Sequence, residues 1–288
     1  MYDYATNIRK LRKQKNLKQT DLAAGICSQG MISKIEKKQL RPDIDLLILI
    51  AKKLDVSVGE LIGEHTESQN KKYLMHITNL LNAREFDVLE SYLDSKAATD
   101  ESVLNNPAFS KWLKGVLLAM NHADAEGALQ ELNEALEIVQ ASGEPQDELV
   151  VRIYTTLAST YILMKDYTQS IKYCELAIAL LPKTELDFAT KQKVYYTLAL
   201  SYSYQQNFAE TIFHTQIAIQ VGLENSSLYL LDDLYILLTN TYIETKEYDK
   251  ALAALEKATL LADIKNHYVL KPYIERNATK LKQLMDNQ

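Results

Sequence analysis

The sequence predicts an all-α protein in two parts, and two observations carry that prediction. Apolar residues recur at helical spacing along most of the 288 residues, and only 8 Gly and 5 Pro interrupt them. From Tyr154 onward, aromatic and small residues return with a period of 41 and then 40 positions. Periods of this length are typical of stacked helical hairpins. We therefore expect a short helical module at the N-terminus and a helical repeat array after it.

The N-terminal module holds five short segments of helical character. In the first, Ile8 and Leu11 share an apolar face, and the basic residues around them are expected on the solvent side: Arg9, Lys10, Arg12 and Lys13. The second, "QTDLAAGI", ends at Gly25, and the third starts after Ser28, a good helix cap. The inward residues expected in the third are Met31, Ile32 and Ile35. The segments "DIDLLILIAKKL" and "SVGELI" complete the five.

Charge separates the module from the body. Residues 1–42 contain ten Lys and Arg against three Asp and Glu, whereas the remaining residues contain 22 against 35. The chain as a whole has a formal net charge of −6. A basic module on an acidic protein is typical of polyanion binding that is confined to one end. A basic face that is merely solvated is the alternative.

The second and third segments, joined by a tight turn at Ile26 and Cys27, have a helix-turn-helix layout. The module resembles the DNA-binding domains of bacterial and phage repressors, through L-x-Q-x-x-L-A, then S-x-I-E, then P-x-x-x-x-L-x-x-I-A-x-x-L. At Lys18 the capping Thr or Ser of that family is missing, and Asn16 or Thr20 is expected to substitute. The competing interpretation is a small helical domain that binds protein.

The resemblance implies that the third helix enters the major groove of DNA. Residues near its start would read base edges, and basic residues after it would hold phosphates. The expected DNA-binding residues are Gln19, Ser28, Gln29, Gly30, Ser33, Lys34, Lys37, Lys38 and Arg41.

The body repeats one pattern three times. Its positions are Tyr154, Leu157, Ala158, Tyr161, Tyr167 and Ala177, then Tyr195, Leu198, Ala199, Tyr202, Phe208 and Ala218, then Tyr235, Leu238, Thr239, Tyr242, Tyr248 and Ala258. Weaker copies start at Trp112 and Tyr73, which gives five helical pairs and a final helix, "YVLKPYIERNATKLKQLM". The 18 Tyr are then mostly repeat core.

Each unit resembles the tetratricopeptide pattern, which implies a right-handed superhelix whose first helices line a concave face. We expect that face to bind a short extended peptide through charged, amide, hydroxyl and apolar side chains. The candidate peptide-binding residues are Arg152, Thr156, Ser159, Lys193, Tyr196, Thr197, Leu200, Tyr204, Asp233, Leu237, Asn240 and Glu244.

The sequence lacks the motifs of catalysis. No metal-ligand spacing, phosphate loop, nucleophile elbow or dinucleotide fingerprint occurs, so we expect neither an enzyme nor a metal or other cofactor. Cys27 and Cys174 are far apart and are expected to be small apolar residues. No apolar run reaches the roughly 18 residues of a membrane span, and the first residues lack the hydrophobic segment of a signal peptide. We expect a cytoplasmic protein without membrane contact.

Taken whole, the chain resembles the PlcR-like peptide-sensing quorum regulators of Gram-positive bacteria, a superfamily that includes Rgg, Rap, NprR and PrgX. The resemblance implies a homodimeric transcription factor in which a short signalling peptide controls binding to double-stranded promoter DNA. The expected domains are a DNA-binding domain at 1–64, a linker with helical potential at 65–72, and a repeat domain at 73–288 for peptide binding and dimerisation.

One departure from that superfamily concerns the peptide backbone. Its members tend to hold the backbone with asparagines, but two such positions here are Thr160 and Thr197. Asn121 and Asn240 are the candidate substitutes. Two other functions stay open on the sequence alone. The protein is either a constitutive DNA-binding factor that uses its repeats as a protein-docking platform, or a factor that sequesters another regulator.

Overall fold

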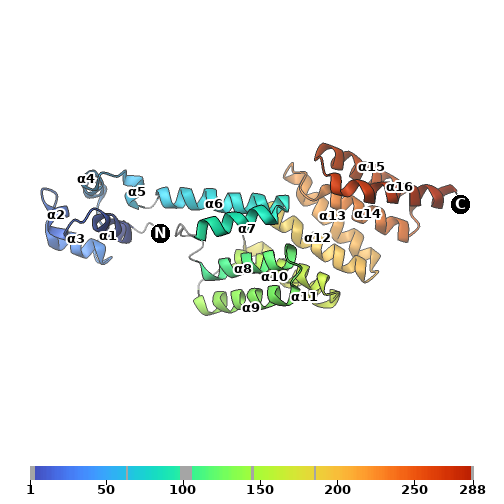
Figure 1. Cartoon of the computed structure of the whole chain (residues 1–288), viewed down its shortest axis with the longest axis horizontal. Helices are drawn as coiled ribbons and strands as arrows, with labels where there is room; N and C mark the ends of the chain where they lie inside the picture. Colours follow the sequence, from blue (N-terminus) through green and yellow to red (C-terminus); the bar gives the residue numbers. More distant parts are fainter. Residues whose placement is uncertain (1–3, 63, 98–105, 144–145, 185, 287–288) are drawn as a thin grey trace. The chain divides into compact units, whose positions relative to one another are not determined.

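The computed structural model describes residues 4–62, 64–97, 106–143, 146–184 and 186–286. Every regular element in this described part is a helix (Figure 1), which confirms the predicted all-α class. The described chain divides into two compact units, the first ending at Asn79 and the second starting at Leu80. No helix among the described residues is long and apolar enough to cross a membrane.

All five segments predicted for the N-terminal module are helices. They are α1 (Tyr4–Gln14), α2 (Gln19–Ala23), α3 (Gln29–Glu36), α4 (Ile44–Leu54) and α5 (Val58–Ile62). Ser28 caps α3 because its hydroxyl accepts a hydrogen bond from the backbone nitrogen of Met31 at 3.3 Å. Asp43 caps α4 in the same way through the backbone nitrogen of Leu46 at 2.8 Å. Gly25, at a φ of +80°, turns the chain between α2 and α3.

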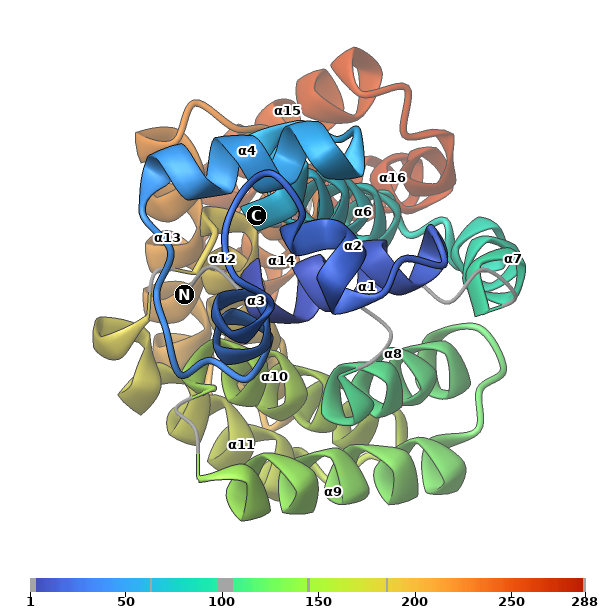
Figure 2. The ribbon, with the colours of Figure 1, turned by 90° about the vertical axis from the view of Figure 1, so that its left-hand side faces the viewer.

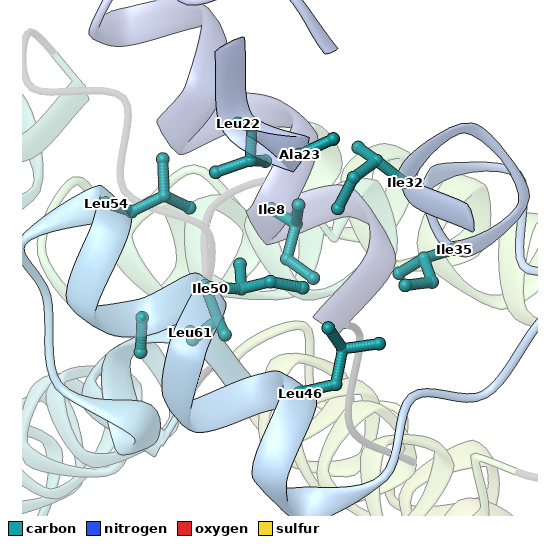
Figure 3. Close-up of a cluster of buried hydrophobic side chains, with 10 residues drawn as sticks. Ile8, Leu22, Ala23, Ile32, Ile35, Leu46, Ile50, Leu54 and Leu61 are labelled. Carbon is teal, nitrogen blue, oxygen red and sulfur yellow. The ribbon is translucent and has the colours of Figure 1, made fainter. Parts of the chain in front are cut away.

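One aliphatic core holds α1 to α5 together. Ile8, Leu22, Ile32, Ile35 and Ile50 converge from four helices and are fully buried (Figure 3). Burial of each such side chain contributes about 1.5–3 kcal/mol, so the core accounts for the mutual placement of α2 and α3. The expectation for Met31 is wrong, because its side chain is 37% exposed. It belongs to the outer face of α3.

The start of α2 differs from the expectation. Neither Asn16 nor Thr20 supplies the missing cap at Lys18. Instead, the carboxylate of Asp21 accepts a hydrogen bond from the backbone nitrogen of Lys18 at 2.8 Å. A carboxylate three residues into a helix can reach back to the capping position in this way. After α5, helix α6 (Glu64–Ala83) includes the residues for which a linker with helical potential was predicted.

The second unit is an array of antiparallel helix pairs (Figure 1). Its helices are α7 (Phe86–Ala97), α8 (Pro107–Met120), α9 (Ala125–Ser142), α10 (Asp147–Leu163), α11 (Tyr167–Leu180), α12 (Phe188–Tyr204), α13 (Phe208–Glu224), α14 (Leu231–Glu244), α15 (Tyr248–Ile264) and α16 (Lys271–Asp286). Short 3-10 turns occur at Leu181–Lys183 and Tyr268–Leu270. Counting the end of α6, from Leu80 on, with α7, the second unit has the five predicted pairs and the final helix among its described residues.

The turn inside each pair repeats one backbone geometry. The residue in the left-handed region, with φ between 53° and 62°, is in turn Arg84, Ala123, Lys165, Gln206 and Lys246. In two of the turns the next residue is an aspartate that caps the second helix. Asp124 accepts from the backbone nitrogen of Gly127 at 2.9 Å, and Asp166 accepts from that of Gln169 at 3.1 Å. Each repeat of the sequence therefore contains the same turn geometry as well as the same pattern of core residues.

The first helices of successive pairs pack against one another, in the order α8, α10, α12, α14 and α16. Figure 2 shows α8 and α10 on the inner side of the array and α9 and α11 on its outer side. We call the face formed by α8, α10, α12 and α14 the inner wall. Between the two layers the predicted Tyr161 stacks on Tyr173, with ring centres 5.5 Å apart.

A buried amide inside the array leads to a stability prediction. Gln192 on α12 is fully buried, and neither its Oε1 nor its Nε2 has a hydrogen-bond partner. One repeat earlier the same position is Val151, also fully buried. Replacing Gln192 by methionine, which has a similar length, is expected to raise the free energy of unfolding by about 1–2 kcal/mol, because two unpaired buried polar atoms disappear.

Chemical denaturation of the full chain measures this change. The matched control is Gln216→Met, at an exposed position of α13, which should leave stability unchanged. A Gln192→Met protein that is less stable than the parent would show that the amide is satisfied in solution, for example by a buried water.

Candidate functional site

The outer face of α3 is the candidate DNA-reading surface. Ser28, Gln29, Gly30 and Lys34 are exposed, and Ser33 is half-buried. Ile32 and Ile35 anchor the opposite face of the helix in the core. This arrangement places the polar residues of α3 where the sequence predicted them, on the side away from the core.

A buried ion pair lies directly beneath this surface. The guanidinium of Arg12 on α1 donates to both carboxylate oxygens of Glu36 on α3, at 2.6 Å and 3.0 Å, and to the carbonyl of Leu17 at 2.6 Å. Arg12 was expected on the solvent side, and that expectation is wrong. Burial alone would raise the pKa of Glu36, but the hydrogen bonds from Arg12 and Gln19 hold it below its ordinary value.

Glu36 also positions two glutamines of the candidate DNA-reading surface through hydrogen bonds. The amide nitrogen of Gln19 donates to Glu36 at 2.9 Å, which leaves the Gln19 oxygen facing α3. That oxygen accepts from the amide nitrogen of Gln29 at 2.8 Å. The chain of contacts from Arg12 to Gln29 therefore fixes which end of the exposed Gln29 amide points away from the protein. An amide oriented in advance is suited to paired hydrogen bonds with an adenine.

The remaining candidates for DNA contact surround α3. Lys37, Lys38 and Arg41 follow its C-terminal end and are exposed. Arg9 and Lys13 on α1 are exposed as well. Exposed cations around a recognition helix are suited to phosphate contacts, which position the helix on DNA without reading sequence.

In the second unit, α10 and α12 are joined on the inner wall by a polar cluster. Arg152 donates to Asp187 at 2.7 Å and to the hydroxyl of Thr190 at 2.9 Å. Its guanidinium lies 5.9 Å from the ring centre of Trp112 on α8, and the Trp112 indole donates to Thr156 at 3.0 Å. Burial alone would raise the pKa of Asp187, but Arg152 and Thr190 hold it below its ordinary value.

Lys193 lies one helical turn beyond that cluster, on α12. Burial and the positive charges of Arg84 and Arg152 lower the pKa of its ammonium to about 8. The ammonium forms no hydrogen bond or ion pair with any residue of the described part. Next along α12, burial raises the pKa of the Tyr196 hydroxyl. The middle of the inner wall thus carries a half-buried ammonium that has no partner among the described residues.

Arg84, in the turn between α6 and α7, forms an ion pair with α14, the last of the four inner-wall helices. Its Nη2 lies 3.1 Å from the carboxylate of Asp233 on α14, which is 10% exposed. Burial raises the pKa of Asp233, although the charge of Arg84 opposes that change. Electrostatic interactions therefore connect four of the predicted inner-wall residues. Lys193 interacts with Arg152 and Arg84, and Tyr196 interacts with Asp233 and Arg84. Arg84 was not among the sequence-based candidates, because its partner is 149 residues away in the chain.

Other candidates for the peptide-binding face have contacts of their own. Thr156, Thr197 and Leu237 are buried. Ser159 and Leu200 are half-buried, and Tyr204 is exposed and stacks on Tyr167 with ring centres 4.9 Å apart. The two threonine hydroxyls donate to carbonyls four residues earlier in their own helices. The side chains of Thr156, Thr197 and Leu237 are therefore covered by the rest of the protein and are not on its accessible surface.

The C-terminal helix occupies the last part of the wall. Asn277 on α16 donates to Asn240 at 2.8 Å, and Lys280 on α16 pairs with Glu244 at 3.1 Å. Thr160, at a position where the superfamily tends to have asparagine, is fully buried, and the candidate substitute Asn121 donates to Glu90 at 3.1 Å. Contacts with α16 thus engage the last two candidates along the wall, Asn240 and Glu244.

Asp232, next to Asp233, has a structural ion pair of its own. It is fully buried and binds both Lys265 and, at 2.7 Å, the imidazole of His267, in the loop after α15. Asp232, Asp233 and His267 are a group of the size that could hold a metal ion. However, Lys265 and Arg84 already supply the positive charge that such a group needs. We therefore interpret the cluster as a tie between α14 and the chain after α15.

This tie predicts a pH dependence of stability. Burial alone would raise the pKa of Asp232, but Lys265 and His267 hold it below its ordinary value. A carboxylate with a lowered pKa in the folded state stabilises the fold above its unfolded-state pKa, and that stability is lost as the pH falls through the folded-state pKa. Thermal unfolding between pH 5 and pH 2 should therefore show a steeper loss of stability in the parent than in Asp232→Asn. Parallel profiles would contradict the structural role of the pair.

Family models match both parts of the chain. A helix-turn-helix model matches residues 8–61, and a tetratricopeptide repeat model matches residues 151–184 and 232–263. These matches confirm the two motif types that the sequence predicted.

Solved structures extend the match over the whole chain. The crystal structure of Bacillus thuringiensis PlcR in complex with the peptide PapR7 and DNA is 20% identical, covers 95% of this chain and 99% of that one, and has a TM-score of 0.67. The chain has the PlcR-like fold. The apo form of the same protein gives a TM-score of 0.65 at 18% identity and covers 96% of this chain and 99% of that one. The predicted resemblance to the PlcR-like superfamily is thus confirmed at the level of fold.

One curated relative is a transcriptional activator. The transcriptional activator NprA of Geobacillus stearothermophilus is 23% identical over 261 residues, which cover 89% of this chain and 62% of NprA. The chain thus spans about three fifths of the length of that relative.

Proposed function

We propose that the protein is a cytoplasmic DNA-binding transcriptional regulator whose repeat unit binds a short signalling peptide and thereby controls promoter binding. One observation carries the proposal. An outward-facing α3 with a pre-oriented Gln29 is combined, in one chain, with an inner wall of partly buried charges, in a fold whose PlcR structure holds a peptide and DNA. No catalytic step is part of this function.

The proposed domains keep the bounds that the sequence suggested. Residues 1–64 bind DNA, residues 65–72 connect the two parts within α6, and residues 73–288 bind the peptide. The protein acts as a homodimer, because one helix-turn-helix reads a single half-site and specific affinity commonly requires two. For the peptide to act as a signal, it must bind the DNA-competent arrangement more tightly, or less tightly, than the other arrangement.

Selection of DNA tests the first half of this proposal. Fragments of the genomic DNA of the source organism are incubated with the purified full chain at fixed salt, and bound fragments are sequenced. We expect an enriched inverted repeat with half-sites about one helical turn apart, since a two-fold symmetric dimer reads a palindrome.

The same selection with Lys34→Gln/Arg41→Gln should lose the enrichment, whereas Lys282→Gln, a change on α16, should keep it. Absence of an enriched sequence with the parent protein would contradict DNA reading by α3. It would favour a role in which the repeats act on another protein.

A further inference from the structure

The Arg84–Asp233 ion pair joins helix pairs that are not neighbours in the array. Arg84 lies in the turn before α7, and Asp233 lies in the first turn of α14. Contacts elsewhere on the inner wall, such as Arg152 with Asp187, connect helices of adjacent pairs. The Arg84 side chain thus crosses from the first helix pair to the fifth.

Solvent reaches the two members of the pair unequally, because the Asp233 side chain is 10% exposed and the Arg84 side chain is 48% exposed. Tyr196 on α12 and Tyr229 before α14 are close enough to interact electrostatically with Arg84 and Asp233. Burial raises the pKa of the Tyr229 hydroxyl to about 12. Only Asp233 is shielded, so water still screens part of the attraction between Arg84 and Asp233.

The charges around the pair are not balanced. Asp233 has Arg84 as a partner and Asp187 has Arg152, but the Lys193 ammonium has none among the described residues. Arg84 and Arg152 both repel it. The wall therefore has one positive charge in excess at its centre, and a carboxylate is the ligand group that complements it.

We propose that the Arg84–Asp233 pair is a latch, which opens when a carboxylate of the ligand binds Arg84 together with Lys193. This inference rests on the proposed peptide binding and adds the chemistry and consequence of that binding. Arg84 exchanges one carboxylate partner for another, and Asp233 is left without its ion-pair partner. Release of Arg84 frees the α6–α7 turn from α14.

Amide hydrogen exchange in the full chain tests the latch itself. Arg84→Gln and Asp233→Asn should each accelerate exchange in residues 80–93 by about five- to tenfold, because a coupling across a partly buried pair is lost. The double variant should be no faster than either single variant. Lys280→Gln, which breaks the exposed pair with Glu244, is the matched control and should leave residues 80–93 unchanged.

Unchanged exchange in both single variants, with α8 and α9 still protected, would overturn the latch. Effects that simply add in the double variant would overturn it as well, because two groups that act only through each other cannot contribute separately.

The chemistry of the ligand is tested with three pools of random heptapeptides. One pool has a free C-terminus and no acidic side chains, the second has an amidated C-terminus with Asp and Glu, and the third has no carboxylate. Affinity selection should enrich peptides from the first or second pool, which identifies the source of the carboxylate. The enriched peptides should accelerate exchange in residues 80–93 and should bind Lys193→Gln about tenfold more weakly.

The outcomes separate this inference from the proposed function. Equal enrichment from the pool without carboxylates would overturn the latch mechanism and leave peptide sensing intact. No enrichment from any pool, by a protein that still selects DNA, would overturn peptide sensing and this inference with it.

Discussion

Replacing Glu36 by glutamine is expected to reduce the stability of the N-terminal module by about 3 kcal/mol, because the buried Arg12 guanidinium loses its counter-charge. Native-state amide exchange in α1 to α4 of the full chain measures this loss. The expected free energy corresponds to exchange that is roughly 100-fold faster.

Two control variants test whether the lost stability comes from the unpaired Arg12 charge. Asp45→Asn removes an exposed carboxylate from α4 and should change exchange little. The double variant Arg12→Met/Glu36→Met should recover most of the lost stability, since replacing both members of a buried pair by apolar groups is often neutral. If Glu36→Gln is as stable as the parent, the pair does not hold α1 against α3.

Replacing Gln29 by alanine is expected to weaken binding to the selected DNA by about 1–3 kcal/mol while leaving binding to scrambled DNA unchanged. Gln29 is the exposed end of the contacts that start at Arg12, and its amide is held by Gln19 at 2.8 Å. Fluorescence anisotropy on both DNA sequences at one salt concentration measures the difference.

Gln14→Ala is the matched control, because Gln14 ends α1 and is exposed. It should bind both DNA sequences like the parent protein. Lys37→Ala provides the contrast, because loss of a phosphate contact should weaken both complexes equally and lower their salt dependence. Equal losses on selected and scrambled DNA for Gln29→Ala would contradict base reading by this residue.

Much of the fold was predictable because its signals are local. The spacing of Tyr154, Leu157, Ala158 and Tyr161 marks one helix, and its recurrence marks the array, because each pair needs the same core and the same turn. The apolar stripes around Ile8, Leu22 and Ile32 likewise belong to single helices. Patterns within about 40 residues therefore predicted the five pairs, the final helix and the helices of the N-terminal module.

The sequence did not reveal contacts that depend on distant partners. Arg12 stands in a run of basic residues and looks solvated, but Glu36, 24 residues away, makes its burial favourable. Arg84 lies in a turn that resembles four others, and only the fold brings it to Asp233. Met31 lies next to the fully buried Ile32 but is turned about 100° around the helix axis, and it is 37% exposed. The environments of these residues become clear only from the three-dimensional structure, because the spacing of residues in the sequence does not reveal their distant neighbours.

The peptide-binding candidates show the same limit. Positions along the first helices were predicted from the repeat alone, which does not tell which of them a neighbouring helix covers. The structure shows that α16 contacts Asn240 and Glu244, and that Thr156, Thr197 and Leu237 are buried. Their roles in ligand binding remain predictions, and Arg152, Lys193, Tyr196 and Asp233 become the first residues to test.

The central claim is that a peptide bound by the repeats controls DNA binding, and one titration tests it most directly. Fluorescence anisotropy is measured with the full chain and the selected DNA at fixed salt, with and without short peptides encoded near its gene. The account predicts that one peptide shifts the affinity at least fivefold, and that Lys193→Gln reduces the shift without changing DNA binding in the absence of peptide. Specific DNA binding that no peptide alters would contradict the account and would assign the repeats to protein docking.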